Sequence, residues 1–399
     1  MAESAVIVDA VRTPGGRRNG SLGGWHAADL AGTVLAAIAE RNDLDPALVD
    51  DVVMGCVSQV GDQAVNVGRS AVLAAGWPES VPATTIDRQC GSSQQAAHFA
   101  AQGVIAGAYD VVVAAGVEVM TRTPMGASGA SGHPFGPMVE QRYADVDSFG
   151  HRGLVNQGIS AELIAERWGL SREDLDAFGL QSQQRAAAAR DEGRFERELL
   201  PVEVRTWDPE AREAQHHGRH LTADEGIRAS TADKLADLKP AFLPDGRVTA
   251  GNSSQITDGA SAVLIMSERR AEQLGLTPRA RFHTFAVAGD DPIAMLTAPI
   301  PATRKVLERS GLTRDDIDVV EINEAFASVV LAWQAETGFD LEKVNRNGGA
   351  IALGHPLGSS GTKLMATLLC ELERSGGRYG LQTMCEGAGL ANATIIERI

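Results

Sequence analysis

The sequence predicts an α/β protein made of two similar halves with a long insertion. Short Val/Ile runs alternate with amphipathic, alanine-rich stretches. The second half repeats the order of segments found in the first, and a polar stretch separates the two. Alternation of strands with helices is typical of α/β layers around a parallel sheet. We therefore expect a mostly parallel sheet.

Each predicted element follows from its own pattern of apolar residues. Continuous apolar runs indicate buried strands, whereas amphipathic stretches indicate helices that bury one face. On this basis we predict strands at 5–11, 49–57, 109–117 and 261–267, and helices at 26–42 and 91–107.

The repeat is visible in two pairs of segments. LDPALVDDV at 44–52 corresponds to LTRDDIDVV at 312–320, and each is a polar turn that leads into a strand. Cys90 opens CGSSQQAAHF and His355 opens HPLGSSGTKL. Both continue through a Gly-Ser-Ser turn, a helix, a glycine turn and a strand. We interpret this as two copies of one α/β unit, packed face to face, with reactive residues at equivalent helix starts.

A polar insertion interrupts the first copy. It contains a charged helix candidate at 160–198 and the stretch HHGRH at 216–220. We interpret the three histidines of that stretch as a solvated surface turn rather than a metal site, because no carboxylate or cysteine signature accompanies them. Long insertions over an α/β sheet often cover a ligand site. The expected division is a first half at 1–120 plus 245–272, an insertion at 121–244 and a second half at 273–399.

Composition excludes several classes of protein. The chain has 399 residues, of which 44% are hydrophobic and 22% charged, so a globular protein of more than one domain is expected. The net charge of −16 disfavours nonspecific nucleic-acid binding. No apolar run is long enough for a membrane span, and the N-terminal stretch does not resemble a secretory signal. Four cysteines without a CxxC pair indicate neither a zinc site nor a disulfide framework, so a cytoplasmic location is expected.

Two residues at predicted helix starts could act together. Cys90 precedes the helix predicted at 91–107, where free backbone N–H groups and the positive end of the helix dipole should lower the thiol pKa. The alternative is a buried structural cysteine at a strand–helix junction. His355 lies between two glycine clusters and is followed by Pro356, a favoured first residue of a helix. A cysteine–histidine pair can activate a nucleophile.

Two further residues lie at predicted strand ends. Cys385 precedes a glycine turn that contains Gly387 and Gly389, where backbone N–H groups could form an oxyanion hole. Asn323, in EINEAFA, could hold a water or a carbonyl oxygen with its side-chain amide. Two cysteines with one histidine suggest a nucleophile and a separate acid/base.

Over essentially its whole length the sequence resembles the thiolases, and the resemblance implies a thiolase-like fold. Five blocks carry it: DRQCGSSQQ around Cys90, VTAGNSSQITDGASAVL at 248–264, NEAFA at 323–327, GGAIALGHPLGSSG around His355 and CEGAG at 385–389.

The resemblance implies an acetyl-CoA C-acyltransferase. Cys90 would attack a 3-ketoacyl-CoA, His355 would take its proton, and Cys385 would act as acid/base. His355 with a water held by Asn323 would form one oxyanion hole, and the N–H groups of Cys90 and Gly387 the other. CoA is then a co-substrate, with no tightly bound cofactor and no metal. The implied ligands are 3-ketoacyl-CoA, CoA and acetyl-CoA, and the implied assembly is a homo-oligomer, a dimer or tetramer.

The resemblance also implies contacts with CoA. By matched position, Arg228 would lie on the adenine or phosphate side, Ser254 would touch pantetheine, and Phe242 and Phe326 would form pocket walls. Ordinary surface or core roles are the alternative for all four.

Two departures from the family's pattern bear on the substrate. Asn156-Gln157-Gly158 stands where many thiolases have His-Met-Gly, and Glu386 follows Cys385 where many have a small or apolar residue. Both resemble thiolases of actinobacterial lipid and steroid breakdown, which favours a bulky or polar acyl group. A carboxylate facing inward beside Cys385 would raise the pKa of that thiol.

Three other readings remain open. An acetoacetyl-CoA thiolase would run the same chemistry on a short substrate. A ketoacyl-synthase type of enzyme should carry a second catalytic histidine instead of Asn323 and Cys385. A noncatalytic CoA- or lipid-binding relative should have lost Cys90 or His355, and both are present.

Overall fold

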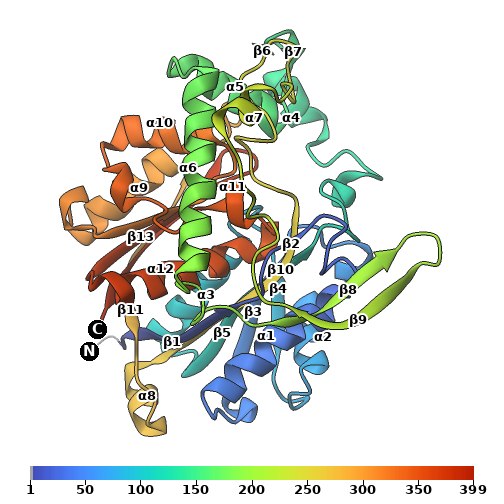
Figure 1. Ribbon diagram of the computed structural model, residues 1–399. Coiled ribbons are helices and arrows are strands. Elements are labelled where there is room, and N and C mark those ends of the chain that lie inside the picture. The colour runs from blue at the N-terminus through green and yellow to red at the C-terminus, as the bar shows by residue number, and fades with distance from the viewer. Residues whose placement is uncertain (1–2) are drawn as a thin grey trace.

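A ten-stranded mixed sheet forms the frame of the chain in the computed structural model, which describes residues 3–399 (Figure 1). Along the sheet the strands follow the order β12-β13-β14-β11-β1-β10-β5-β3-β4, and β2 pairs with β10. Their bounds are β1 Ala5–Arg12, β2 Gly16–Arg17, β3 Asp51–Gly55, β4 Ala83–Ile86, β5 Val111–Val119, β10 Thr257–Ser267, β11 Ala280–Gly289, β12 Val319–Ile322, β13 Tyr379–Glu386 and β14 Leu390–Arg398.

The strand order is symmetric about the junction of β1 and β11. Outward from β1 come β10, β5 and β3, and outward from β11 come β14, β13 and β12. The junction itself is short, with the antiparallel partners Val6–Arg281 and Ile7–Ala280. The two copies inferred from the sequence are therefore confirmed as two half-sheets of matching order.

The expectation of a mostly parallel sheet is wrong. The pairs β3–β4, β3–β5 and β12–β13 are parallel, but antiparallel pairs join the other neighbouring strands described. The reason is that each half ends in a strand, β10 or β14, that returns beside its predecessor in the opposite direction. An alternation of strands and helices predicts the parallel pairs, but it does not predict a strand that returns in the opposite direction.

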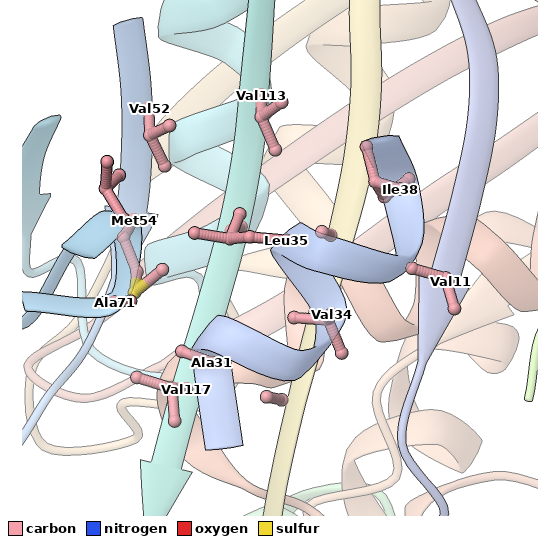
Figure 2. Close-up of a cluster of buried hydrophobic side chains, with 14 of the residues drawn as sticks. Val11, Ala31, Val34, Leu35, Ile38, Val52, Met54, Ala71, Val113 and Val117 are labelled. Atoms are coloured by element: carbon pink, nitrogen blue, oxygen red, sulfur yellow. The ribbon is translucent and has the colours of Figure 1, made fainter. Parts of the chain in front are cut away.

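Helices cover the outer face of the first half-sheet. In α1, Ala27–Arg41, apolar residues recur at Ala31, Val34, Leu35 and Ile38, a helical spacing that places them on one face. Figure 2 shows this face against the strands, including Val113 of β5. The shorter helix α2, Val67–Ala74, belongs to the same buried cluster.

A middle layer of two helices lies between the half-sheets. These are α3, Ser92–Ile105, and α12, Ser360–Ser375, which pack in one core with strands of both halves. Small residues permit their close approach: a Cβ added at Gly361 would overlap the Gln94 backbone. The two helices whose starts follow Cys90 and His355 are thus direct neighbours.

The outer layer of the second half combines helices of that half with helices of the insertion. The cluster of buried residues on this side includes side chains of α9, Pro299–Ser310, and α10, Ala327–Thr337. Ile164 and Leu175 join it from α5, Gln157–Arg167, and α6, Arg172–Asp191. The insertion therefore packs on the second half. The remaining helices are α4 Gly136–Tyr143, α7 Ala232–Ala236, α8 Glu268–Leu274 and α11 Ala350–Leu353.

Two expectations for the insertion are corrected. The charged stretch 160–198 is two helices, because the chain turns at Gly169, where φ is +61°, and Ser171 then caps α6 by accepting from the Asp174 N–H. HHGRH is a strand rather than a turn. It lies in β9, Glu213–Leu221, which pairs with β8, Val202–Asp208, in a hairpin that projects from the body (Figure 1).

The histidines of this hairpin are exposed and have ordinary polar partners. His216 Nδ1 lies 3.1 Å from Glu203 Oε1, and His217 Nε2 lies 2.8 Å from Thr206 Oγ1. Within residues 3–399, no group of three or more His, Cys, Asp or Glu side chains is arranged to hold a metal ion. No helix in that range is long and apolar enough to cross a membrane. The insertion also contains the small hairpin of β6, Asp147–Ser148, and β7, His151–Arg152.

The close approach of the middle helices generates a stability prediction. Gly361→Ala should lower the free energy of unfolding by about 2 kcal/mol or more, because the new methyl group overlaps backbone atoms of α3 that cannot rotate away. Alanine is intrinsically the better helix former, so a gain in stability would show that the helices separate freely. Urea unfolding measures the effect. Gly132→Ala, at an exposed position with no atom within 4 Å of the added Cβ, is the matched control and should be neutral.

Candidate active site

The candidate residues converge from both halves. Cys90 immediately precedes the first turn of α3, and His355 lies between α11 and the short 3-10 turn that leads into α12. In one buried cluster, Cys90 packs with Leu357 and Met384, which are sequence neighbours of His355 and Cys385. The middle-layer helices therefore bring the two reactive helix starts and the end of β13 together.

The chain presents Cys90 from a constrained turn. The preceding residue, Gln89, has φ of +47°, in a region that side chains other than glycine adopt rarely. Cys90 is 4% exposed. Gln157, at the start of α5, places its side-chain amide in hydrogen-bond contact with the thiol.

The expected low pKa of Cys90 is wrong. The pKa of this thiol is raised to about 12: burial is the main cause and the nearby Glu386 carboxyl contributes, while the Gln157 amide and the backbone N–H of Cys90 act in the opposite direction. Desolvation therefore outweighs the start of the helix. At neutral pH the resting residue is a thiol, so it needs a base to become a nucleophile.

His355 is held in a tautomer that suits a base. Its Nδ1 lies 2.5 Å from Ser360 Oγ, and Ser360 Oγ donates in turn to the Pro356 carbonyl at 2.9 Å. Ser360 must therefore accept from Nδ1–H. The other ring nitrogen, Nε2, carries the lone pair and lies 3.3 Å from Asn323 Nδ2. This tautomer leaves Nε2 able to accept a proton.

The protein also keeps this imidazole neutral. The pKa of His355 is lowered to about 3, mainly by burial and in addition by the positive charge of Lys363. Lys363 is itself buried in α12 and donates to the carbonyls of Leu353 and Gly354, at 3.1 and 2.9 Å. These two bonds hold the Lys363 ammonium group beside Gly354, the residue that precedes His355. A neutral imidazole is the form that a general base requires.

Cys385 is the penultimate residue of β13 and is fully buried. Burial raises the pKa of its thiol well above the ordinary value, with further contributions from Cys90 and Glu386, which agrees with a position close to Cys90. A tight turn follows, in which Ala388 has φ of +64°. Gly387 approaches the loop before Cys90, since a Cβ at this glycine would lie 3.0 Å from Gln89 Oε1.

Asn323 follows β12 directly and is buried. Its backbone N–H donates to the Thr383 carbonyl at 3.1 Å, which extends the parallel β12–β13 ladder by one bond. The side chain is therefore held at the carboxyl end of the second half-sheet, beside His355. Parallel strands commonly present functional groups at this edge.

The four residues matched to CoA contacts are an aromatic pair that packs together and two polar residues with separate contacts. Phe242 and Phe326 pack edge to face with ring centroids 6.1 Å apart, and Phe242 also packs on Gly158, next to Gln157. Arg228 is exposed and donates to the Ala250 carbonyl at 3.1 Å. Ser254 is half-buried, and its backbone N–H donates to the Ala325 carbonyl at 2.9 Å.

Sequence reasoning predicted no local contact for three residues near this site, although it placed Gln157 in a segment that bears on the substrate. Ser360 fixes the His355 tautomer, Lys363 disfavours the imidazolium, and Gln157 contacts the Cys90 thiol. A signal existed for Lys363, since a single lysine on the buried face of an amphipathic helix needs a specific partner. For Ser360 and Gln157 the contact depends on how distant segments meet.

Chemically, this arrangement fits nucleophilic acyl transfer. The buried Cys90 thiol packs against neighbours of His355 and Cys385, the Cys385 thiol is close enough for Cys90 to affect its pKa, and the Asn323 amide lies against His355 Nε2. Such groups can form a covalent thioester and move a proton to or from carbon.

The influence of Lys363 generates a titration prediction. Lys363→Met should raise the pKa of His355, because it removes a positive charge that opposes protonation. Burial is the larger cause and remains, so the pKa should stay below 6.5. NMR titration of carbon-13-labelled histidine, assigned with His355→Asn, measures the shift. An unchanged pKa in a folded Lys363→Met protein would contradict the electrostatic role, and Lys239→Met, at an exposed site, should leave the pKa unchanged.

The sign of the pH effect on stability follows from the same pKa. Between pH 3 and 6.5 the unfolded chain binds a proton at His355 that the native protein excludes. Stability should therefore rise with pH across this window. In Lys363→Met the folded-state pKa of His355 should be higher, so the pH range over which stability rises should become narrower. Thermal unfolding at several pH values can measure this range.

Comparison with known proteins agrees with this geometry. Residues 5–269 match the family model described as the thiolase N-terminal domain, and residues 276–398 match that of the thiolase C-terminal domain. A steroid 3-ketoacyl-CoA thiolase of Mycobacterium tuberculosis is 50% identical, over 99% of this chain and 94% of the relative. A β-ketoadipyl-CoA thiolase of Escherichia coli is 44% identical, over 99% of both chains.

A solved structure shows the same fold. The acetyl-CoA acetyltransferase of Bacillus anthracis superposes with a TM-score of 0.88 at 37% identity, covering 100% of this chain and 99% of that one. The two family models meet between 269 and 276, which is the stretch between β10 and β11 where the first half-sheet gives way to the second. On these grounds the chain belongs to the thiolase family.

Proposed function

We propose that the protein is an acetyl-CoA C-acyltransferase that cleaves a 3-ketoacyl-CoA with CoA, giving acetyl-CoA and a shortened acyl-CoA. The observation that carries the proposal is the packing of Cys90 with Leu357 and Met384, sequence neighbours of His355 and Cys385, in one buried cluster of a thiolase-family chain. Because the Cys90 thiol is protonated at rest and His355 is a neutral base, the pair suits a nucleophile that is activated only when substrate is present.

The proposed reaction has two stages. His355 Nε2 takes the Cys90 proton, and the sulfur attacks the 3-keto carbonyl. The carbon–carbon bond then breaks, Cys385 protonates the departing acetyl-CoA carbanion, and the acyl group remains on Cys90 as a thioester. In the second stage the Cys385 thiolate takes the thiol proton of CoA, and the CoA sulfur attacks the thioester. The bond between the acyl group and Cys90 breaks, the Cys90 sulfur recovers its proton from His355, and the shortened acyl-CoA leaves.

Two oxyanion holes would stabilise the charges that develop. Asn323, through a water, together with His355 would serve one, and the backbone N–H groups of Cys90 and Gly387 would serve the other. The buried position of Asn323 beside His355 and the approach of Gly387 to Gln89 support both assignments.

We further propose a bulky acyl group from fatty-acid or steroid breakdown. A pocket of about 320 Å³ lies between the segment before Asn156 and the turn after Cys385, and its volume is within the range of small-molecule sites. Its lining is mostly apolar: Phe135, Val139, Arg142, Tyr143, Leu154, Val155, Asp290, Pro292, Met295 and Ala388. The steroid substrate named for the Mycobacterium relative supports the same class.

The CoA portion is proposed to bind where the insertion, 121–244, meets the halves formed by 1–120 with 245–272 and by 273–399. The Phe242–Phe326 pair, which lies next to Gln157, supports a wall for pantetheine. Ser254, which follows Phe242 by twelve residues, is proposed to touch pantetheine. Arg228 is exposed, which suits the adenine or phosphate side. CoA would be a co-substrate, and no tightly bound cofactor is proposed.

The proposals for assembly and location rest on exposed apolar side chains and on free thiols. A homo-oligomer, dimer or tetramer, would cover exposed apolar side chains of the insertion such as Met125, Phe135 and Met138. A cytoplasmic location fits four cysteines that are all free thiols.

A second candidate is an acetoacetyl-CoA thiolase. It is favoured by the Bacillus structure and by an acetyl-CoA acetyltransferase of Allochromatium vinosum that is 42% identical over 100% of both chains. A noncatalytic CoA- or lipid-binding relative is the candidate of a different class. Substrate preference distinguishes the acetoacetyl-CoA thiolase from the proposed enzyme. Acylation of Cys90 distinguishes the proposed enzyme from a noncatalytic relative.

Intact-protein mass spectrometry with acetoacetyl-CoA, a medium-chain 3-ketoacyl-CoA and a steroid-ring-derived 3-ketoacyl-CoA tests the proposal. We expect an acyl adduct on Cys90 that added CoA discharges, forming fastest with the bulky substrate, and no adduct in Cys90→Ala. Acylation by acetoacetyl-CoA alone would establish the short-chain candidate. A folded protein whose Cys90 reacts with iodoacetamide yet forms no adduct would favour the noncatalytic reading.

The same assay isolates the role of Cys385. Cys385→Ala should still transfer the acetyl group of acetyl-CoA to Cys90, because that step forms no carbanion. It should lose condensation to acetoacetyl-CoA, which needs a base at the α-carbon. Loss of acetylation in a folded Cys385→Ala protein would overturn the acid/base assignment.

A further inference from the structure

Glu386 is a buried carboxyl for which the mechanism above has no use. Side chains alternate along a strand, so Glu386 points to the opposite face of β13 from Cys385. It is 0% exposed. Within residues 3–399, neither of its carboxyl oxygens has a hydrogen-bond partner of normal geometry. A buried polar group in this state requires an explanation.

The carboxyl lies against the backbone just after Cys90. A Cβ added at Gly91 would overlap Glu386 Oε1, and it would also lie 2.9 Å from Asn392 Oδ1. Two side chains from neighbouring strands, β13 and β14, thus bring oxygen atoms to the same side of Gly91. Asn392 Oδ1, like the carboxyl oxygens, has no donor among the described residues.

The orientation of the Asn392 amide is fixed by its other contacts. Its Nδ2 group donates to Gln95 Oε1 and to His98 Nδ1, each at 3.1 Å. His98 Nδ1 can accept because Nε2 carries the proton and lies 2.7 Å from Thr394 Oγ1. Burial, with the charge of Arg88, lowers the pKa of His98 to about 3, so the ring stays neutral. With Nδ2 bound to these two acceptors, Oδ1 lies on the side of Gly91 that Glu386 occupies.

Two facing acceptors need a proton between them. We propose that Glu386 is a neutral carboxylic acid whose O–H donates to Asn392 Oδ1, and that this bond holds the end of β13 against the Cys90–Gly91 turn. Glu386 is then a positioning residue. Its catalytic consequence rests on the proposed roles of Cys90 and Cys385, whereas its protonation state does not.

The charges around Glu386 agree with a neutral acid. Burial raises the pKa of Glu386 well above its ordinary value and Asp87 raises it further, while Arg88 and the Asn392 N–H lower it. Arg88 forms no ion pair with Glu386 among the described residues. The other titratable groups nearby are the two thiols, Cys90 and Cys385, whose pKa values an ionised carboxylate would raise. A neutral acid places no negative charge where Cys90 must become a thiolate.

The test compares Glu386→Gln with Glu386→Leu. Glutamine is isosteric with the neutral acid and can donate to Asn392 Oδ1, so we expect an unchanged pH profile for the reaction of Cys90 with iodoacetamide and kcat/KM within about threefold of wild type. Leucine leaves Asn392 Oδ1 without a donor, so kcat should fall about tenfold or more with KM little changed. Glutamine restoring what leucine loses distinguishes a hydrogen bond from mere packing.

Two outcomes would overturn the proposal. If Glu386→Gln moves the Cys90 profile toward lower pH by about one unit or more, the native carboxyl is ionised. If the infrared difference spectrum between wild type and Glu386→Gln contains no band of a protonated carboxyl, the proton is absent. Glu308→Gln, at an exposed position, is the matched control for both measurements. Neither readout uses turnover, so they hold even if the proposed thiolase activity fails.

Discussion

Close packing of α3 against α12 is the constraint on which the site depends. The helices lie between the two half-sheets and approach through small residues, with Gly361 against the backbone of Gln94. Because Cys90 precedes one helix and His355 precedes the other, this single contact sets the position of both. The duplication therefore does more than build two similar halves. Equivalent positions of the two copies carry different residues, and their juxtaposition makes one site.

Burial then determines how the site can react. It raises the pKa of both thiols and lowers the pKa of His355, so the proposed nucleophile and the proposed base are both uncharged at neutral pH. Charge must then appear only as the proton moves, where prepared N–H donors stabilise it best. Lys363 supports this state by disfavouring the imidazolium. A neutral Glu386 would support it too, by keeping a carboxylate charge away from the sulfurs.

Much of this could be predicted from the sequence, and the failures have physical reasons. Glycine clusters around His355 and Cys385 and the small residues after Cys90 marked the reactive turns, because only small residues permit such close approach. The antiparallel direction of the returning strands β10 and β14 was missed because periodicity does not encode strand direction. The low pKa expected for Cys90 failed because the depth of burial is set by distant segments, and Gln157 and Ser360 depend on the same assembly.

The most direct measurement is the rate at which iodoacetamide alkylates Cys90 near neutral pH, in wild type and in His355→Asn. If the neutral imidazole activates the buried thiol, the wild-type rate should exceed that of the folded variant by about 10²-fold, the size of a general-base contribution. Equal rates in two proteins of equal stability would show that Cys90 does not depend on His355, and that the meeting of the two helix starts is structural rather than chemical.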